Sequence, residues 1–96
     1  MYEVPMVRYQ VVLEELAIRH IAALKRSGNA GLCRKLGNLL EELAEHPREG
    51  AGKPEMLRGN LSGYWSRRIS REHRLVYSIE DNIVTVTVIS ARGHYE

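Results

Sequence analysis

The sequence predicts an α+β fold in which two N-terminal helices pack on one face of a twisted antiparallel β-sheet. In the first half of the chain, apolar residues recur every three or four positions in two stretches, which is the spacing of amphipathic helices. In the second half, three segments of alternating apolar and polar residues are joined by short polar turns, as in an antiparallel meander. The 96 residues suffice for one hydrophobic core and not for two, so we expect residues 1–96 to form a single domain.

A short strand is expected first, at residues 2–6, where apolar and other side chains alternate. Pro5 cannot donate a hydrogen bond to a neighbouring strand, so this strand belongs at an edge or a break of the sheet. From about residue 9 to residue 26 the period becomes helical, with the stripe Leu13, Leu16, Ala17, Ile21 and Leu24. Residues 27–29 turn the chain, and Pro47 closes a second helix. Its apolar stripe is Leu32, Leu36, Leu39, Leu40 and Leu43.

Residues 63–69, 73–79 and 83–91 have the patterns of three strands, separated by turns at 70–72 and 80–82. A period of two places one set of side chains on the face that should cover the helices: Trp65, Ile69, Leu75, Tyr77, Ile79, Val84, Val86 and Val88. The opposite face should be open, and it carries Arg68, Arg74, Thr85 and Thr87. An open, polar and cationic sheet face is suited to binding an anion.

The positive charge of the chain is concentrated in residues 53–77, which contain six of the fourteen lysines and arginines but only two acidic residues. A local cationic patch on a nearly neutral protein attracts phosphate at contact range, so nucleic acid is the first partner to consider. The single cysteine, Cys33, excludes an internal disulfide and fits a reducing compartment. No apolar run approaches the length of a membrane span, so we expect a cytoplasmic protein without a membrane partner.

A few polar side chains have the right chemistry for a reaction. Arg74 falls on the polar face, where a long cation needs an anionic partner, although most surface arginines are simply solvated. Glu55 follows a stiff Lys-Pro step, yet a glutamate in a loop is usually solvated too. His94 is close enough to the end of the last strand to be held there. The alternation along its strand places Arg67 on the apolar face of the sheet, so we expect its side chain to extend past the sheet edge or to pair with an acid.

A carboxylate, a histidine and two or more arginines on one open face could cleave RNA without a metal ion. The carboxylate would take the proton from a 2′-hydroxyl, and the histidine would protonate the departing 5′-oxygen. The arginines would bind the phosphate and stabilise the charge that builds on it. The sequence lacks the cluster of acidic residues that a two-metal nuclease uses, and no histidine has a second potential ligand at the spacing of a metal site. We therefore expect neither a metal nor another cofactor.

The segment GKPEMLRGNLSGYWSRRISREHRLVYSI, with the closing His-Tyr near the C-terminus, resembles the YoeB/Txe toxins of bacterial type II toxin–antitoxin modules, within the RelE/ParE superfamily. The resemblance is dense over residues 52–95, and before residue 50 only the order of the elements agrees. It implies a compact fold of the microbial ribonuclease type. It also implies an mRNA interferase, an endoribonuclease that cuts mRNA in the A site of translating ribosomes.

The resemblance assigns roles to individual residues. It implies that Glu55 is the general base, Arg74 a cation that stabilises the transition state, and His94 the general acid. RNA-binding roles are expected for Lys53, Arg58, Arg68 and Tyr95, with Tyr95 ordering either the RNA or the His94 side chain. The alternation of the strand residues independently places Arg68 and Arg74 on the same face.

The same resemblance implies binding partners for the protein, and two alternative functions remain beside the endoribonuclease. We expect a ribosome with its mRNA and rRNA, and a cognate antitoxin of the YefM/Axe kind with an acidic tail that is disordered until bound. A homodimer is also possible. One alternative is a non-catalytic inhibitor like the gyrase-poisoning ParE branch. Another is a nucleic-acid-binding module of the same fold, whose arginines contact the DNA backbone without any chemistry.

Overall fold

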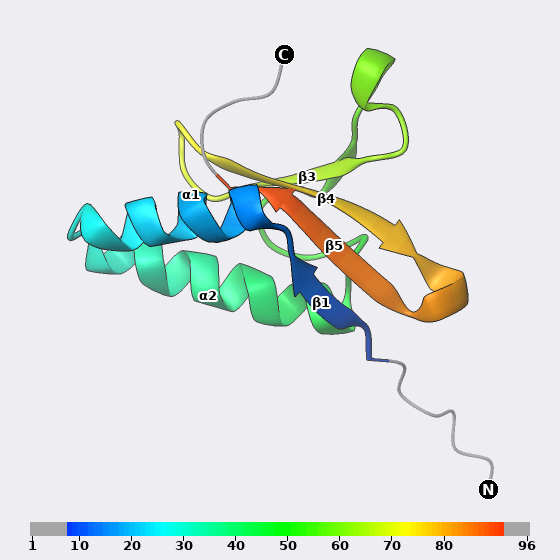
Figure 1. The fold of residues 1–96 in the computed structure, drawn as a ribbon, viewed down its shortest axis with the longest axis horizontal. Coiled ribbons are helices and arrows are strands. Elements are labelled where there is room, and N and C mark those ends of the chain that lie inside the picture. Colours follow the sequence, from blue (N-terminus) through cyan, green and yellow to red (C-terminus); the bar gives the residue numbers. More distant parts are fainter. Residues whose placement is uncertain (1–7, 92–96) are drawn as a thin grey trace, which may run out of the picture.

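The sheet has five strands and packs against two helices (Figure 1). The computed structural model describes residues 8–91, so the strand predicted at residues 2–6 lies outside the described part. The strands are β1 (Gln10–Leu13), β2 (Glu55–Met56), β3 (Trp65–Arg68), β4 (Arg74–Glu80) and β5 (Thr85–Ser90), in the order β1-β5-β4-β3-β2. The predicted meander is formed by β3, β4 and β5, and β2 adds to it antiparallel to β3. The predicted α+β class is therefore confirmed.

The strand β1 runs parallel to β5, so the sheet is mixed and not antiparallel throughout. The prediction of a helix from residue 9 was wrong here. Val11 and Leu13 are half-buried while Gln10 and Val12 are exposed, an alternation that fits a strand. Backbone hydrogen bonds at both ends, from Gln10 N–H to the Val84 carbonyl and from Glu14 N–H to the Val88 carbonyl, attach the strand to β5, each at 2.9 Å.

The helices α1 (Glu15–Arg26) and α2 (Ala30–Glu45) lie side by side against the sheet (Figure 1). The predicted turn between them is confirmed. Gly28 there has φ +79°, which a residue with a Cβ rarely adopts. Asn29 caps α2, because its Oδ1 accepts a hydrogen bond from Leu32 N–H at 2.9 Å. Two short 3₁₀ helices, η1 (Gly59–Leu61) and η2 (Asp81–Ile83), occupy the β2–β3 and β4–β5 connections.

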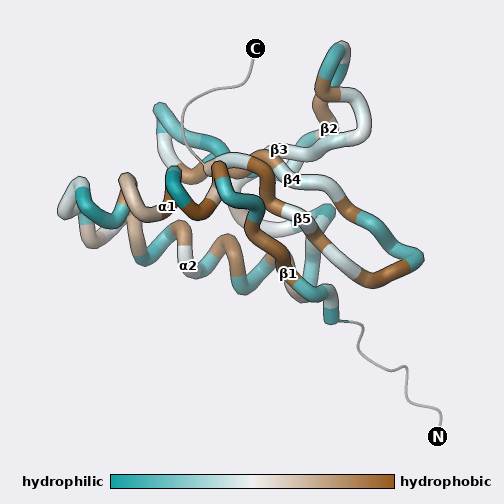
Figure 2. The backbone as a smooth tube through the Cα atoms, viewed as in Figure 1, coloured by the Kyte–Doolittle hydropathy of each residue, from teal (hydrophilic) through white to brown (hydrophobic). Residues whose placement is uncertain are grey.

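The core lies between the helices and the sheet. In Figure 2, the brown of hydrophobic residues recurs along β1, β5 and the helices. Its buried members are Ala17, Ile21, Leu24, Leu36, Leu39, Leu43, Ile69, Leu75, Tyr77, Val86, Val88 and Ala91. Val84 does not belong to the predicted apolar row, because it adopts φ +48° at the end of η2 and β5 begins only at Thr85.

The opposite face of the sheet is less open than the sequence predicted. Thr85 is buried, and its hydroxyl donates to the Ile83 carbonyl within the turn. Arg74 and Thr87 are half-buried, and Arg68 is exposed. The cationic part of this face is therefore limited to the end of β3 and the start of β4.

Candidate active site

An ion pair between Glu55 and Arg74 forms the centre of the candidate site. Glu55 begins β2, in register with Ser66 of β3, and Arg74 begins β4. The Arg74 Nη1 lies 3.1 Å from the Glu55 Oε1, and the same nitrogen lies 3.4 Å from the Ser66 Oγ. The Arg74 side chain is only 16% exposed, whereas that of Glu55 is 53% exposed. The guanidinium is thus held within the sheet face, and the carboxylate remains accessible to a ligand.

Arg68 stands directly opposite Arg74 across β3 and β4. Two like charges in such a cross-strand pair repel each other, so the pair favours an anion between or above them. Arg68 is exposed, and its backbone N–H donates to the Gly52 carbonyl at 2.7 Å. This bond brings the loop that precedes β2 against the cationic end of β3.

Lys53 and Arg58 flank Glu55 in sequence, and both are exposed. Lys53 adopts φ +51°, an uncommon conformation for a residue with a side chain. Arg58 precedes η1 in the β2–β3 connection, which projects away from the helices in Figure 1. Of these cations, Arg68 and Arg74 share the face of Glu55 at the end of β3 and the start of β4, and Lys53 and Arg58 stand in the segments on either side of β2.

His94 and Tyr95 lie outside the described residues, and the description ends at Ala91. Ala91 is buried, and its backbone N–H donates to Nδ1 of His20 in α1 at 3.2 Å. Ser90, just before it, is in register with Val76, two residues beyond Arg74. The chain therefore leaves the described structure at the end of the sheet where Arg74 lies.

Sequence reasoning missed the network that surrounds Arg67. This side chain is completely buried, and its Nη1 pairs with the Glu42 Oε1 of α2. The pairing with an acid was one of the two outcomes expected for Arg67. Its Nε donates to the Tyr77 hydroxyl, which in turn donates to the Pro47 carbonyl. Burial raises the pKa of Tyr77, although the hydrogen bond from Arg67 acts in the opposite direction.

A second cluster that the sequence did not predict joins Asp81 to Arg48 and Tyr9. Arg48 donates through Nη1 and Nη2 to the two carboxylate oxygens of Asp81, at 3.2 and 2.7 Å, and the Tyr9 hydroxyl donates to Oδ1. The hydrogen bond from Arg48 and then that from Tyr9 lower the pKa of Asp81. The hydrogen bond to Asp81 in turn raises the pKa of Arg48. The only signal in the sequence was the acid in a turn, which is too common to indicate a partner.

Within residues 8–91, no group of three or more histidine, cysteine, aspartate or glutamate side chains is arranged to hold a metal ion. None of the helices in that part of the chain is long and apolar enough to cross a membrane.

Comparisons with known proteins agree with the geometry. Residues 23–95 match the model of a family described as the YoeB-like toxin of bacterial type II toxin–antitoxin systems. The chain is 51% identical over 65 residues to Toxin YoeB of Synechocystis sp. strain PCC 6803, an alignment covering 68% of this chain and 73% of the relative. It is 45% identical over 64 residues to Toxin YoeB of Escherichia coli K12, covering 67% and 74%.

Solved structures extend the similarity to the whole fold. A YoeB/ParE toxin from Agrobacterium tumefaciens superposes with a TM-score of 0.82 at 35% identity, covering 90% of this chain and 99% of that one. A YoeB dimer and a YoeB–YefM complex, both from Staphylococcus aureus, superpose with TM-scores of 0.78 and 0.75 at 34% and 36% identity. Each covers 92% of this chain and 99% of its own. The chain therefore belongs to the YoeB-like toxin family of bacterial type II toxin–antitoxin systems.

Proposed function

We propose that this toxin is a ribosome-dependent mRNA endoribonuclease that inhibits translation in the cytoplasm by cutting mRNA in the ribosomal A site. The observation that carries the proposal is the accessible Glu55 carboxylate paired with the half-buried Arg74, beside the exposed Arg68. This set supplies a base and two cations at one place on the sheet. A surface that only bound phosphate would gain nothing from a carboxylate there, because it would repel the ligand.

In the proposed reaction, Glu55 removes the proton from an RNA 2′-hydroxyl, and that oxygen attacks the adjacent phosphorus. Arg74 orients the carboxylate and, with Arg68, stabilises the negative charge that builds on the phosphoryl oxygens. The bond to the 5′-oxygen breaks as His94 donates a proton to that oxygen. The products are a 2′,3′-cyclic phosphate and a 5′-hydroxyl, and DNA is not a substrate because it lacks the nucleophile.

The role of His94 as general acid is taken from the family resemblance, and its short distance in sequence from Ala91, the last described residue, is compatible with it. Three residues of extended chain reach at most about 11 Å. Since Ser90 pairs with Val76 near the start of β4, this reach includes the surroundings of Arg74. Lys53, Arg58 and Tyr95 are proposed to hold the RNA on either side of the cleaved bond.

The proposed partners follow from the relatives and the charge. The Staphylococcus aureus relative is known in complex with YefM and as a dimer. We propose a YefM-like antitoxin whose acidic segment covers the Arg68–Arg74 face, and self-association as a second state of the toxin. Covering that face would exclude RNA through simple charge competition.

The first test is cleavage of mRNA on programmed ribosomes, read by toeprinting. Glu55→Gln preserves the shape of the side chain but removes the base, and we expect a loss of about 10²- to 10⁴-fold in rate. Arg74→Met removes the cation and should cost a comparable factor. Glu41→Gln is the matched control, because Glu41 is an exposed glutamate of α2 away from this face, and it should cleave like the wild type.

Ribosome co-sedimentation separates binding from chemistry. We expect Glu55→Gln to bind ribosomes as well as the wild type does. Full cleavage by Glu55→Gln would exclude the proposed mechanism. A DNA-damage response without any mRNA cleavage would instead favour the gyrase-inhibitor class.

A further inference from the structure

The buried Arg67 guanidinium is fully used in holding one loop. Arginine has five N–H donors, and five acceptors surround this one. They are the Tyr77 hydroxyl, the Glu42 carboxylate and the carbonyls of His46, Glu49 and Ala51. Three of the five belong to residues 46–51, the loop that follows α2. One side chain of the sheet thus binds three carbonyls of a loop that lies outside the helices and strands.

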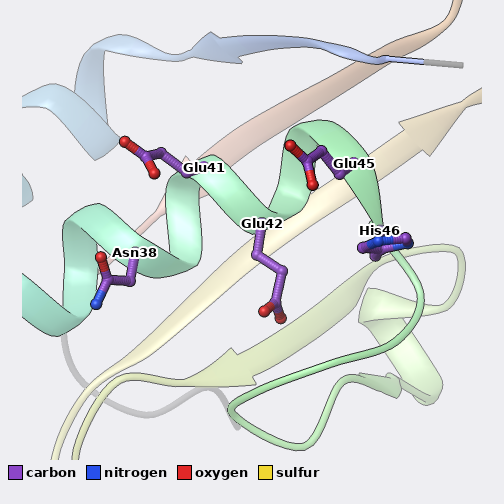
Figure 3. Close-up of a pocket in the computed structure, with 5 residues that line it drawn as sticks. All are labelled: Asn38, Glu41, Glu42, Glu45 and His46. Carbon is purple, nitrogen blue, oxygen red and sulfur yellow. The ribbon is translucent and has the colours of Figure 1, made fainter. Parts of the chain in front are cut away.

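Glu42 is the counterpart of Arg67 on α2. It leaves the helix on a different side from Glu41 and Glu45, as Figure 3 shows. Besides pairing with Arg67, its Oε1 accepts a hydrogen bond from Ala51 N–H at 2.7 Å. Gly50 allows this approach, because a Cβ at that position would lie 2.0 Å from the same oxygen. The carboxylate therefore connects the helix, the loop and the sheet at one point.

The fixed loop leads directly to Glu55. The Gly52 carbonyl accepts from Arg68 N–H at 2.7 Å, and a Cβ on Gly52 would lie only 2.8 Å from the Arg68 carbonyl. Lys53 then has φ +51° immediately before Pro54, a conformation that is sterically unfavourable for a residue preceding proline. Such strain persists only where the surroundings determine the backbone on both sides.

Beyond Pro54 the strand β2 has only two residues, Glu55 and Met56. Its far end is tied by the Leu57 N–H bond to the Tyr64 carbonyl, at 2.9 Å. So short an edge strand cannot set its own position, and its near end depends on the loop that Arg67 holds. Ser66, the register partner of Glu55, is the residue next to Arg67 in β3.

We propose that Arg67 is a positioning residue for Glu55: with Glu42, it fixes residues 46–52 so that the strained Lys53–Pro54 step delivers the Glu55 carboxylate to Arg74. This inference rests on the proposed role of Glu55 as general base. Arg67 lies on the helix side of the sheet and does not touch the RNA. A displacement of the base by about 1 Å is enough to cost up to about 100-fold in rate, so the loop geometry controls catalysis.

The test compares Arg67→Lys and Gly50→Ala with the wild type in single-turnover cleavage of mRNA on programmed ribosomes. Lysine keeps the charge but cannot supply the five donors of the guanidinium fork. Gly50→Ala crowds the Glu42 carboxylate and also strains the loop backbone, because Gly50 has φ +114°, while the Arg67 side chain itself is unaltered. For both variants we expect the maximal rate to fall by about 10- to 100-fold, with the half-saturating ribosome concentration changed by less than about threefold.

Two controls separate positioning from general destabilisation. Leu24→Ala opens a cavity under α1, away from the loop, and should retain the wild-type maximal rate at a comparable loss of Tm. Glu42→Gln preserves an acceptor oxygen for Arg67 and Ala51, and it should retain more activity than Glu42→Ala. If Leu24→Ala loses as much rate as Arg67→Lys at equal Tm, the positioning role is excluded.

Amide hydrogen exchange gives a readout that does not depend on activity. The Arg68 N–H reports the bond to Gly52, and the Leu57 N–H reports the far end of β2. In Arg67→Lys and Gly50→Ala we expect the Arg68 amide to exchange about tenfold faster or more, while Leu57 stays within about twofold of the wild type. Unchanged exchange at Arg68 would overturn the proposal. If the wild type does not cleave mRNA, the proposed function fails, and this exchange result alone decides whether Arg67 fixes the loop.

Discussion

Two adjacent arginines of β3 show how one residue type takes different roles on the two faces of a strand. Arg67 points into the protein, where a carboxylate, a hydroxyl and three carbonyls satisfy its donors. Arg68 points to the other face and is exposed opposite Arg74. A buried charge is tolerated only when it is paired and hydrogen-bonded, so Arg67 is structural and cannot bind RNA. Arg68 has the accessibility that phosphate binding needs.

Tyr77→Phe tests the network around Arg67 at the level of one atom. The Tyr77 hydroxyl accepts from Arg67 Nε at 3.1 Å and donates to the Pro47 carbonyl at 2.8 Å. Its removal leaves a buried donor and a buried acceptor without a partner. We expect a loss of about 1–3 kcal/mol in unfolding free energy, measured by urea denaturation. At about 4–8 °C per kcal/mol, this is a visible fall in Tm.

Tyr64→Phe is the control for the same change of side chain. Tyr64 is half-buried, and no hydroxyl partner for it is found in the described part of the chain. Its stability should change by less than about 0.5 kcal/mol. Equal losses in the two variants would mean that the Tyr77 hydroxyl bonds add nothing to stability.

Among the elements, those with a long and regular period were predictable. Both helices have inward stripes of leucine and alanine, and β3, β4 and β5 were found within a few residues of their bounds. The strand β1 was not, because Leu13 also fits the helical stripe that continues at Leu16 and Ala17. Only the pairing with β5, some 75 residues away in sequence, decides that residues 10–13 are extended. Tertiary contacts of this kind override local propensity.

The candidate site was predictable where alternation alone determined a side chain. Arg68 and Arg74 were placed on one face by parity, and the register confirms this. The ion pair of Arg74 with Glu55 depends on β2, and two residues are too few to give a periodic signal. The parity of Arg67 marked it as unusual, but its contacts come from three segments that only the fold brings together. The roles of these residues in catalysis stay predictions.

The α2 helix offers a prediction about a single element. Asn29 Oδ1 accepts from the Leu32 N–H and so satisfies one of the unpaired donors at the helix start. We expect Asn29→Ala to lower the unfolding free energy by about 1 kcal/mol, which thermal unfolding would detect as a Tm loss of about 4–8 °C. Asn38→Ala, an exposed change within the same helix, should have no such cost. Equal stability of the two variants would contradict a capping role for Asn29.

At the scale of the whole molecule, Asp81 joins segments that are distant in sequence. Tyr9 precedes β1, Arg48 lies in the loop after α2, and Asp81 begins the β4–β5 turn. Since Arg48 stands in the loop that also binds Arg67, this loop is held both by the buried network and by an ion pair at the surface. The surface tie depends on ionisation, because the acceptor is a carboxylate.

The pH dependence of stability should reveal this surface tie. The pKa of Asp81 is lowered in the folded protein from its ordinary value of 3.8, because Arg48 and Tyr9 stabilise the ionised carboxylate. As the pH falls, the unfolded chain binds the proton first, so acidification favours unfolding. The contribution of the tie is therefore complete well above pH 3.8 and is lost as the pH falls below 3.8 toward the lowered folded pKa.

Asp81→Asn lacks the ionisable group, so its Tm should lie below that of the wild type at pH 7, and the two values should converge on acidification. Glu80→Gln is the matched control: Glu80 is the exposed neighbour of Asp81, and no ion pair of its side chain is found within residues 8–91. Its difference from the wild type should be small at every pH. Thermal unfolding by circular dichroism from pH 7 to about pH 2.5 measures all three proteins. A gap between the wild type and Asp81→Asn that stays constant over this range would show that the charge of Asp81 does not stabilise the fold, because only an ionised carboxylate loses its advantage in acid.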